Sequence, residues 1–183
     1  MTVEPPLYAE IVQFWSEAGP KRWFAKDAAF DQAIRSEYEI VHLAAARGEY
    51  ADWAETPEGA LALVLLLDQF PRNLHRGSAG AFASDPLARQ VASAAIAAGH
   101  DQAFAQDLRV FFYLPFEHSE DAADQDRSVA LIGALDLPDY QRFAVMHRDL
   151  ILRFGRFPHR NALLGRESTA EEAAYLAGGG FKG

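Results

Sequence analysis

An uninterrupted apolar run, Ala60 to Leu67, constrains most strongly what this chain can fold into. A helix that is apolar on every face has no side to offer to solvent, so we expect it at the centre of a helical domain. Thr56 and Pro57, just before the run, are residue types preferred at the cap and the first position of a helix. Pro71 follows soon after the run and lacks the amide hydrogen that a helix interior needs. The sequence therefore predicts a buried helix that ends just before Pro71.

The rest of the chain shows the same helical spacing of apolar residues, with glycine and proline marking the ends of segments. No stretch has the alternating pattern of a strand. We predict an all-α protein, a single domain over residues 1–183 with about seven to nine helices in antiparallel pairs, bundle-like or superhelical, around the buried helix. The three consecutive glycines of residues 178–180 predict a flexible tail over residues 178–183. The other helices are expected over residues 7–17, 27–47, 84–98, 103–112, about 117–134 and 139–154, with a short last helix opened by a capping box at residues 168–172.

Composition excludes several classes of protein. The chain has no cysteine, so disulfides, thiolate nucleophiles and cysteine metal sites are impossible. A net charge of −9 argues against a dedicated nucleic-acid binder. The first ten residues lack the basic and apolar regions of a signal peptide, and the apolar run is too short to cross a bilayer. We therefore expect a cytoplasmic protein with no nucleic-acid or membrane partner.

Polar residues gather in two stretches beside apolar ones. The first follows the buried helix directly, as Asp68-Gln-Phe-Pro-Arg-Asn73. The second is Phe111 to Asp121, FFYLPFEHSED, where the predicted helix places His118 one turn before Ala122 and turns Gln125 or Asp126 inward. A buried amide or imidazole needs hydrogen-bond partners, which must come from other segments.

The third stretch is rich in arginine. Six arginines and one acidic residue lie between residues 140 and 166, and the loop reads Arg153-Phe-Gly-Arg-Phe-Pro-His-Arg-Asn161. Guanidinium groups in such a loop are suited to hold a carboxylate or a phosphate with two hydrogen bonds. Alternatively, they pair with acidic residues elsewhere, such as Asp68, Glu117 or Asp121. The loop also echoes the first stretch, QFPRN against RFPHRN, either by chance or because two halves contribute similar corners to one site.

His147 falls on the inward stripe of the predicted helix 139–154, together with Phe143, Leu150, Ile151 and Phe154. A single inward histidine is more often a hydrogen-bonded core residue than a catalyst. Several side chains of the two later stretches offer nitrogen and oxygen ligands. The sequence contains neither two Glu-x-x-His motifs that could pair nor a His-Glu-x-x-His motif. We therefore expect no metal and no cofactor.

Taken together, LLLDQFPRN, FFYLPFEHSED and RFGRFPHRN resemble the signatures of a bacterial family catalogued as domain of unknown function 924. The resemblance covers nearly the whole chain, from Phe14-Trp15 to the last helix. It implies an all-helical fold related to the tetratricopeptide-like superhelices. It implies no established activity, and so no catalytic residues.

We expect the three stretches to converge on one end of the buried helix and to form a polar cleft that binds a small anionic ligand. His118 and Glu117 would be placed for proton transfer, which suits cofactor-independent hydrolase or lyase chemistry. The alternative is a tetratricopeptide-like module that binds a protein partner, with the polar motifs as a structural network of hydrogen bonds and ion pairs. The oligomeric state stays open. The predicted lining is Asp68, Arg72, Asn73, Glu117, His118, Gln125, Arg156, His159, Arg160 and Asn161.

Overall fold

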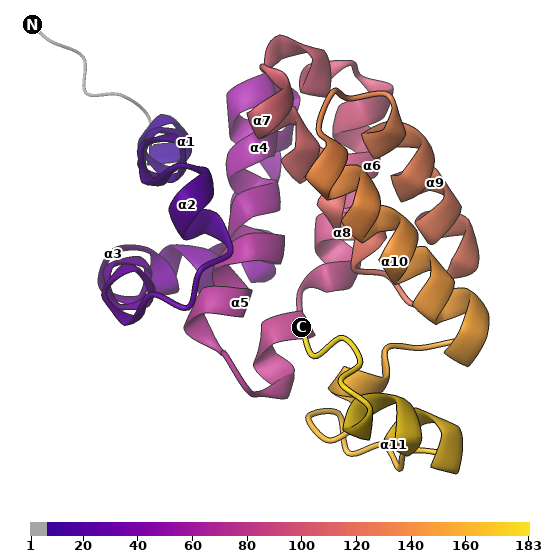
Figure 1. The fold of residues 1–183 in the computed structure, drawn as a ribbon. Helices are drawn as coiled ribbons and strands as arrows, with labels where there is room; N and C mark the ends of the chain where they lie inside the picture. The colour runs from indigo at the N-terminus through magenta and orange to yellow at the C-terminus, as the bar shows by residue number, and fades with distance from the viewer. Residues whose placement is uncertain (1–6) are drawn as a thin grey trace, which may run out of the picture. The chain divides into compact units, whose positions relative to one another are not determined.

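The computed structural model describes residues 7–183, and this part of the chain is helical with no strand (Figure 1). The predicted all-α class is therefore confirmed. The α-helices are α1 (Leu7–Ala18), α2 (Pro20–Trp23), α3 (Ala28–Ala46), α4 (Pro57–Val64), α5 (Phe70–Leu74), α6 (Asp85–Ala97), α7 (Gln106–Arg109), α8 (Leu114–Glu117), α9 (Ala122–Gly133), α10 (Pro138–Phe154) and α11 (Ala170–Ala177). Five short 3₁₀ segments and one π-helical segment join them: η1 (Ala51–Glu55), the π-helical η2 (Leu65–Gln69), η3 (Ala79–Phe82), η4 (His100–Ala103), η5 (Val110–Phe112) and η6 (Pro158–Arg160).

The described residues divide into two compact units, each with its own core. Unit 1 comprises residues 7–76 and 80–115, and unit 2 comprises residues 77–79 and 116–183. In unit 1 the run Ala60–Leu67 is buried on every face, and α1 and α6 pack against α4. The predicted position of this run in a core is confirmed. In unit 2, α9 and α10 lie side by side (Figure 1), and Leu150, Ile151 and Phe157 form a buried cluster.

The predicted end of the central helix before Pro71 is wrong. The helical path runs from α4 through the π-turn η2 into α5, and it ends at Leu74. In the π-turn the amide of Phe70 donates to the carbonyl of Leu65, five residues earlier. The wider turn lets the chain continue past the proline ring, which would meet the preceding turn of a regular α-helix.

Two side chains from other elements complete this π-turn. Because Pro71 has no amide hydrogen, it gives no bond to the carbonyls of Leu66 or Leu67. His42 of α3 contacts the Leu66 carbonyl oxygen through Nδ1 at 2.8 Å, and the Ser84 hydroxyl donates to the Leu67 carbonyl at 2.6 Å. Each of these buried carbonyl groups is thus contacted by a side chain from another segment.

Two further helix boundaries differ from the prediction. Pro115 does not end a helix over residues 103–112. That stretch is α7 and η5, and Pro115 lies in the first turn of α8, where a missing amide hydrogen costs nothing. The helix expected over residues 117–134 begins at Ala122, because the Asp121 carboxylate caps it by accepting from the amides of Ala123 and Asp124 at 2.8 and 3.1 Å. Glu117 and His118 therefore precede α9.

Three predicted helix caps are confirmed. Asp27 caps α3 and Thr56 caps α4, while Thr169 and Glu172 form the predicted capping box of α11. The inward stripe of α10 is confirmed for His147 and for its leucine and isoleucine neighbours, but Phe143 is 43% exposed. Phe143 lies in the first half of α10, and its ring is covered on one side by the Arg142 guanidinium instead of by the core. Within residues 7–183, no helix is both long enough and apolar enough to cross a membrane.

Candidate functional site

The ten predicted site residues fall in both units. Asp68, Arg72 and Asn73 belong to unit 1. The other seven belong to unit 2: Glu117, His118, Gln125, Arg156, His159, Arg160 and Asn161. Their convergence on one site stays a prediction, and each group is described within its own unit.

In unit 1, Asp68 and Arg72 belong to a buried polar cluster at the π-turn. Asp68 is fully buried, and its Oδ2 atom accepts a hydrogen bond from the side-chain Nε2 group of Gln69 at 2.5 Å. Arg72 donates to the Asp68 backbone carbonyl and holds Asp85 with two hydrogen bonds of 3.0 and 3.1 Å. The cluster fastens the end of the central helix to the start of α6.

Asn73 completes a second polar corner of unit 1. Its side-chain amide donates to Asp31 Oδ1 at 2.8 Å. Arg76 donates two hydrogen bonds of 2.6 and 2.9 Å to the same carboxylate. Burial alone would raise the pKa of Asp31, but the hydrogen bonds from Arg76 and Asn73 outweigh it and lower that pKa. An asparagine and an arginine thus share one carboxylate.

Unit 2 contains the same arrangement at the echoing motif. The Asn161 amide donates to Glu172 Oε2 at 3.2 Å, and Arg156 holds that carboxylate with bonds of 2.7 and 2.8 Å. Glu172 is 2% exposed, and the Arg156 hydrogen bond lowers its pKa to about 2. In each motif the Phe-Pro pair opens a short helical turn, and the asparagine that follows reaches a carboxylate held by an arginine. The echo in the sequence thus extends to the asparagine of each motif, whereas the arginine is Arg156 of RFPHRN in unit 2 and Arg76, three residues after QFPRN, in unit 1.

Two more arginines of the stretch between residues 140 and 166 also meet carboxylates. Arg166 holds Glu120 with bonds of 2.7 and 2.9 Å, and the Phe157 amide donates to the same carboxylate at 2.8 Å. Burial would raise the pKa of Glu120, but Arg166 and the Phe157 amide lower it. Arg153 pairs with Glu171 at the surface. Three arginines of the stretch thus hold Glu120, Glu171 and Glu172, which the sequence analysis did not name as partners.

Gln125 fixes the turn that carries Glu117 and His118. Its side chain is fully buried, as expected for an inward position on α9. Its Nε2 group donates to the backbone carbonyls of Glu117 and Ser119 at 2.6 and 2.7 Å. These bonds replace the helical hydrogen bonds that the turn before α9 lacks.

Three histidines and one arginine gather in unit 2. We call His118, His147, His159 and Arg160 the histidine cluster. His147 Nδ1 lies 2.9 Å from its own helix's Phe143 carbonyl oxygen and 3.3 Å from Glu117 Oε1. The His118 and His147 ring centroids are 6.5 Å apart, and Arg160 donates to the His118 carbonyl at 3.0 Å. Glu117 therefore lies beside His147, whose Nδ1 hydrogen is donated to Phe143, whereas the sequence suggested that Glu117 would act with His118.

Burial keeps two of these imidazoles uncharged. It is the main reason why the pKa of His147 falls to about 3 and that of His159 to about 4, and the positive charge of Arg160 contributes to both decreases. At neutral pH both rings are neutral. Since Nδ1 of His147 donates to a carbonyl oxygen, the lone pair of that ring lies on Nε2. Sequence reasoning placed His147 inward but gave it no role in the site.

The chain matches the family described as "Bacterial protein of unknown function (DUF924)" over residues 11–180. It belongs to that family. A solved structure of a protein of unknown function from Agrobacterium tumefaciens is 56% identical, covers 93% of this chain and 96% of its own, and superposes with a TM-score of 0.90. No curated protein matches the chain. The resemblance of the three motifs to DUF924 is confirmed.

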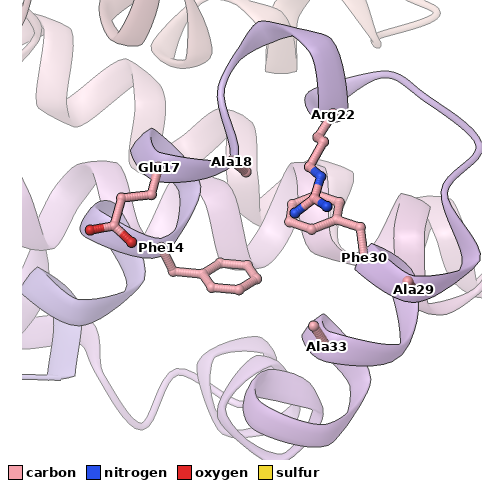
Figure 2. Close-up of a pocket in the computed structure, with 7 residues that line it drawn as sticks. All are labelled: Phe14, Glu17, Ala18, Arg22, Ala29, Phe30 and Ala33. Carbon is pink, nitrogen blue, oxygen red and sulfur yellow. The ribbon is translucent and has the colours of Figure 1, made fainter.

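Two surface pockets of this DUF924 chain each lie within one unit. The pocket of unit 1 has a volume of about 340 Å³, and Figure 2 shows Phe14 and Phe30 beside it, with Glu17 and Arg22 on different sides. The groove of unit 2 has a volume of about 750 Å³ and is lined by Met146, Arg153, Glu171, Ala174, Tyr175 and Gly178 to Phe181. None of the ten predicted site residues lines either pocket. Within residues 7–183, no three histidine, aspartate or glutamate side chains are grouped to hold a metal ion.

Proposed function

We propose that unit 2 binds a small anionic ligand at the histidine cluster. The observation that carries this proposal is the gathering of three imidazoles and the Arg160 guanidinium, together with the state of His159. The Nδ1 atom of His159 is buried and has no hydrogen-bond partner within residues 7–183. A buried polar atom without a partner costs free energy, which a ligand can recover.

Charged groups of both signs surround the two neutral imidazoles, and Arg160 is the cation that acts on both. The groups that act on His147 are Glu117, His118, His159 and Arg160, and those that act on His159 are Arg160, Arg166 and Glu120. Arg160 is the strongest charged influence on His159 and disfavours its protonated form. A bound anion would reverse this effect and raise both pKa values, so binding would be coupled to proton uptake.

Binding is better supported than acid-base catalysis. A carboxylate beside Nδ1 of a histidine is the arrangement that orients general bases, and here it joins Glu117 to His147. A pKa of about 3, however, makes His147 a weak base at neutral pH, far from the value that favours proton transfer. We therefore propose a binding site and no hydrolase or lyase reaction.

The ion pairs support the alternative for part of the predicted lining. Arg156 and Asn161 are engaged with Glu172, and Arg72 is engaged with Asp85, so these side chains hold the corners of the fold. If the anion site fails the test below, the tetratricopeptide-like interaction module remains as the second candidate function.

The test is a titration with inorganic phosphate and with acetate, followed through the histidine ring signals in NMR spectra. We expect signals of His147 and His159 to shift, with a phosphate dissociation constant of about 1 mM or lower. Affinity should rise by up to about tenfold for each pH unit below neutral, because each binding event takes up a proton. His159→Gln should abolish the response, while His100→Gln, a change in η4 of unit 1, should preserve it. Unshifted ring signals in the parent protein would overturn the proposal.

A further inference from the structure

The ring of Phe181 fills a slot in the histidine cluster. It contacts the His147 ring at a centroid distance of 4.9 Å and the His159 ring at 5.1 Å, edge to face in both cases. Both imidazoles also contact Phe157, at 5.4 and 5.6 Å. The two histidines thus bound a subsite of the size and polarity of an aromatic ring, with Phe157 as its base.

The segment that carries Phe181 is held to Tyr175 through two backbone amides. It follows three glycines, of which Gly179 has φ of +86°, a left-handed conformation that favours glycine. Gly180 passes so close to the Tyr175 ring that an added Cβ would lie 2.5 Å from it. The Gly180 and Phe181 amides donate to the backbone carbonyl and the hydroxyl of Tyr175 at 3.0 and 2.9 Å. We call residues 178–183 the strap.

The strap also forms one wall of the groove in unit 2. Phe181 lines this groove together with Met146, Tyr175 and the glycines, while it touches both histidines. If the strap moves outward, the slot and the groove become one continuous space. Met146, Tyr175, Arg153 and Glu171 line that space along the groove, and Arg160 is the cation at the cluster.

We propose that the ligand of the histidine cluster is an aromatic anion whose ring takes the place of the Phe181 ring between His147 and His159. Its carboxylate or phosphate would reach the imidazoles and Arg160, and the displaced strap would open onto the groove. This inference rests on the proposed function, since it names the class of anion that the same site takes.

Paired probes test the proposal. Benzoate and phenyl phosphate differ from acetate and inorganic phosphate by one aromatic ring, so the ratio of affinities isolates the slot. In the parent protein we expect benzoate to bind at least tenfold more tightly than acetate, and phenyl phosphate at least tenfold more tightly than inorganic phosphate. In Phe181→Ala, where the slot is vacant, this ratio should rise by a further fivefold or more. Lys182→Ala, an exposed position of the same strap, should leave the ratio unchanged.

A second measurement does not depend on the stability of Phe181→Ala. A 4-fluorophenylalanine placed at position 181 of the full chain should give a ¹⁹F signal that moves to a solvent-exposed value with benzoate but not with acetate. Equal affinities for aryl and simple anions, or a ¹⁹F signal that stays fixed when benzoate binds, would overturn the proposal that the ligand's ring replaces the Phe181 ring. The proposed anion site would not be affected by either result. Failure of all four anions to bind would overturn the proposed function itself.

Discussion

Gly59 is an exception to the rule that alanine is more stable than glycine in a helix. An alanine in a helix is usually more stable than a glycine by about 0.5–1 kcal/mol. In the first turn of α4, however, a Cβ on Gly59 would lie 2.2 Å from the Trp53 carbonyl oxygen and 2.8 Å from the Thr56 hydroxyl. The nearest atom belongs to the backbone, so it cannot simply rotate away.

We therefore expect Gly59→Ala to destabilise the protein by about 1–3 kcal/mol, the usual cost of overpacking. Gly133→Ala is the matched control, since an added Cβ at Gly133 of α9 meets nothing within 4 Å. Urea unfolding of both variants measures the difference. Equal or higher stability in Gly59→Ala would show that η1 shifts freely to admit the methyl group.

The two polar corners mark the limit of what single residues reveal. The motifs QFPRN and RFPHRN were recognisable as a pair, and the pairing of arginines with carboxylates was one of the readings. The carboxylates themselves were not predictable, because Asp31 lies 42 residues before Asn73 and Glu172 lies 11 residues after Asn161, in a separate helix. Only the tertiary fold brings such partners together, and local sequence carries no record of it.

At the scale of elements, local signals located the start of three helices but not the end of the central one. Asp27, Thr56 and Thr169 each cap the helix that they were expected to open, since a cap depends on residues two or three positions away. The end of the central helix was misplaced because the π-turn depends on side chains of distant elements. His42 and Ser84 supply hydrogen bonds that no local rule could anticipate.

The π-turn gives a prediction for Ser84. Removing its hydroxyl leaves the buried Leu67 carbonyl without that donor, so Ser84→Ala should cost about 1–3 kcal/mol of stability. Ser16→Ala, on the exposed face of α1, should change stability by less than about 0.5 kcal/mol. Denaturant unfolding compares the two. A loss for Ser84→Ala as small as that of the control would mean that another group satisfies this carbonyl.

At the scale of the whole molecule, buried histidines and paired carboxylates make the fold sensitive to acid. Burial lowers the pKa values of His42, His147 and His159 from 6.5, so below pH 6.5 the unfolded chain binds more protons than the folded one. Stability is therefore complete above this pH and falls as the pH falls toward about 3 for His147 and about 4 for His159. Protonation of the Glu172 carboxylate, which is paired with Arg156, causes a second loss of stability as the pH falls from 4.5 to about 2.

We expect the free energy of unfolding to decrease steadily between about pH 6.5 and pH 4.5, with each buried neutral histidine contributing up to about 1.4 kcal/mol per pH unit. Urea titrations across this range measure the slope. His147→Gln keeps a polar side chain but cannot be protonated, so its slope should be shallower than that of the parent, whereas His100→Gln should keep the parent slope. An unchanged slope in His147→Gln would mean that the folded protein protonates His147 as readily as the unfolded chain does. The lowered pKa of His147 would then no longer support the anion site proposed for unit 2.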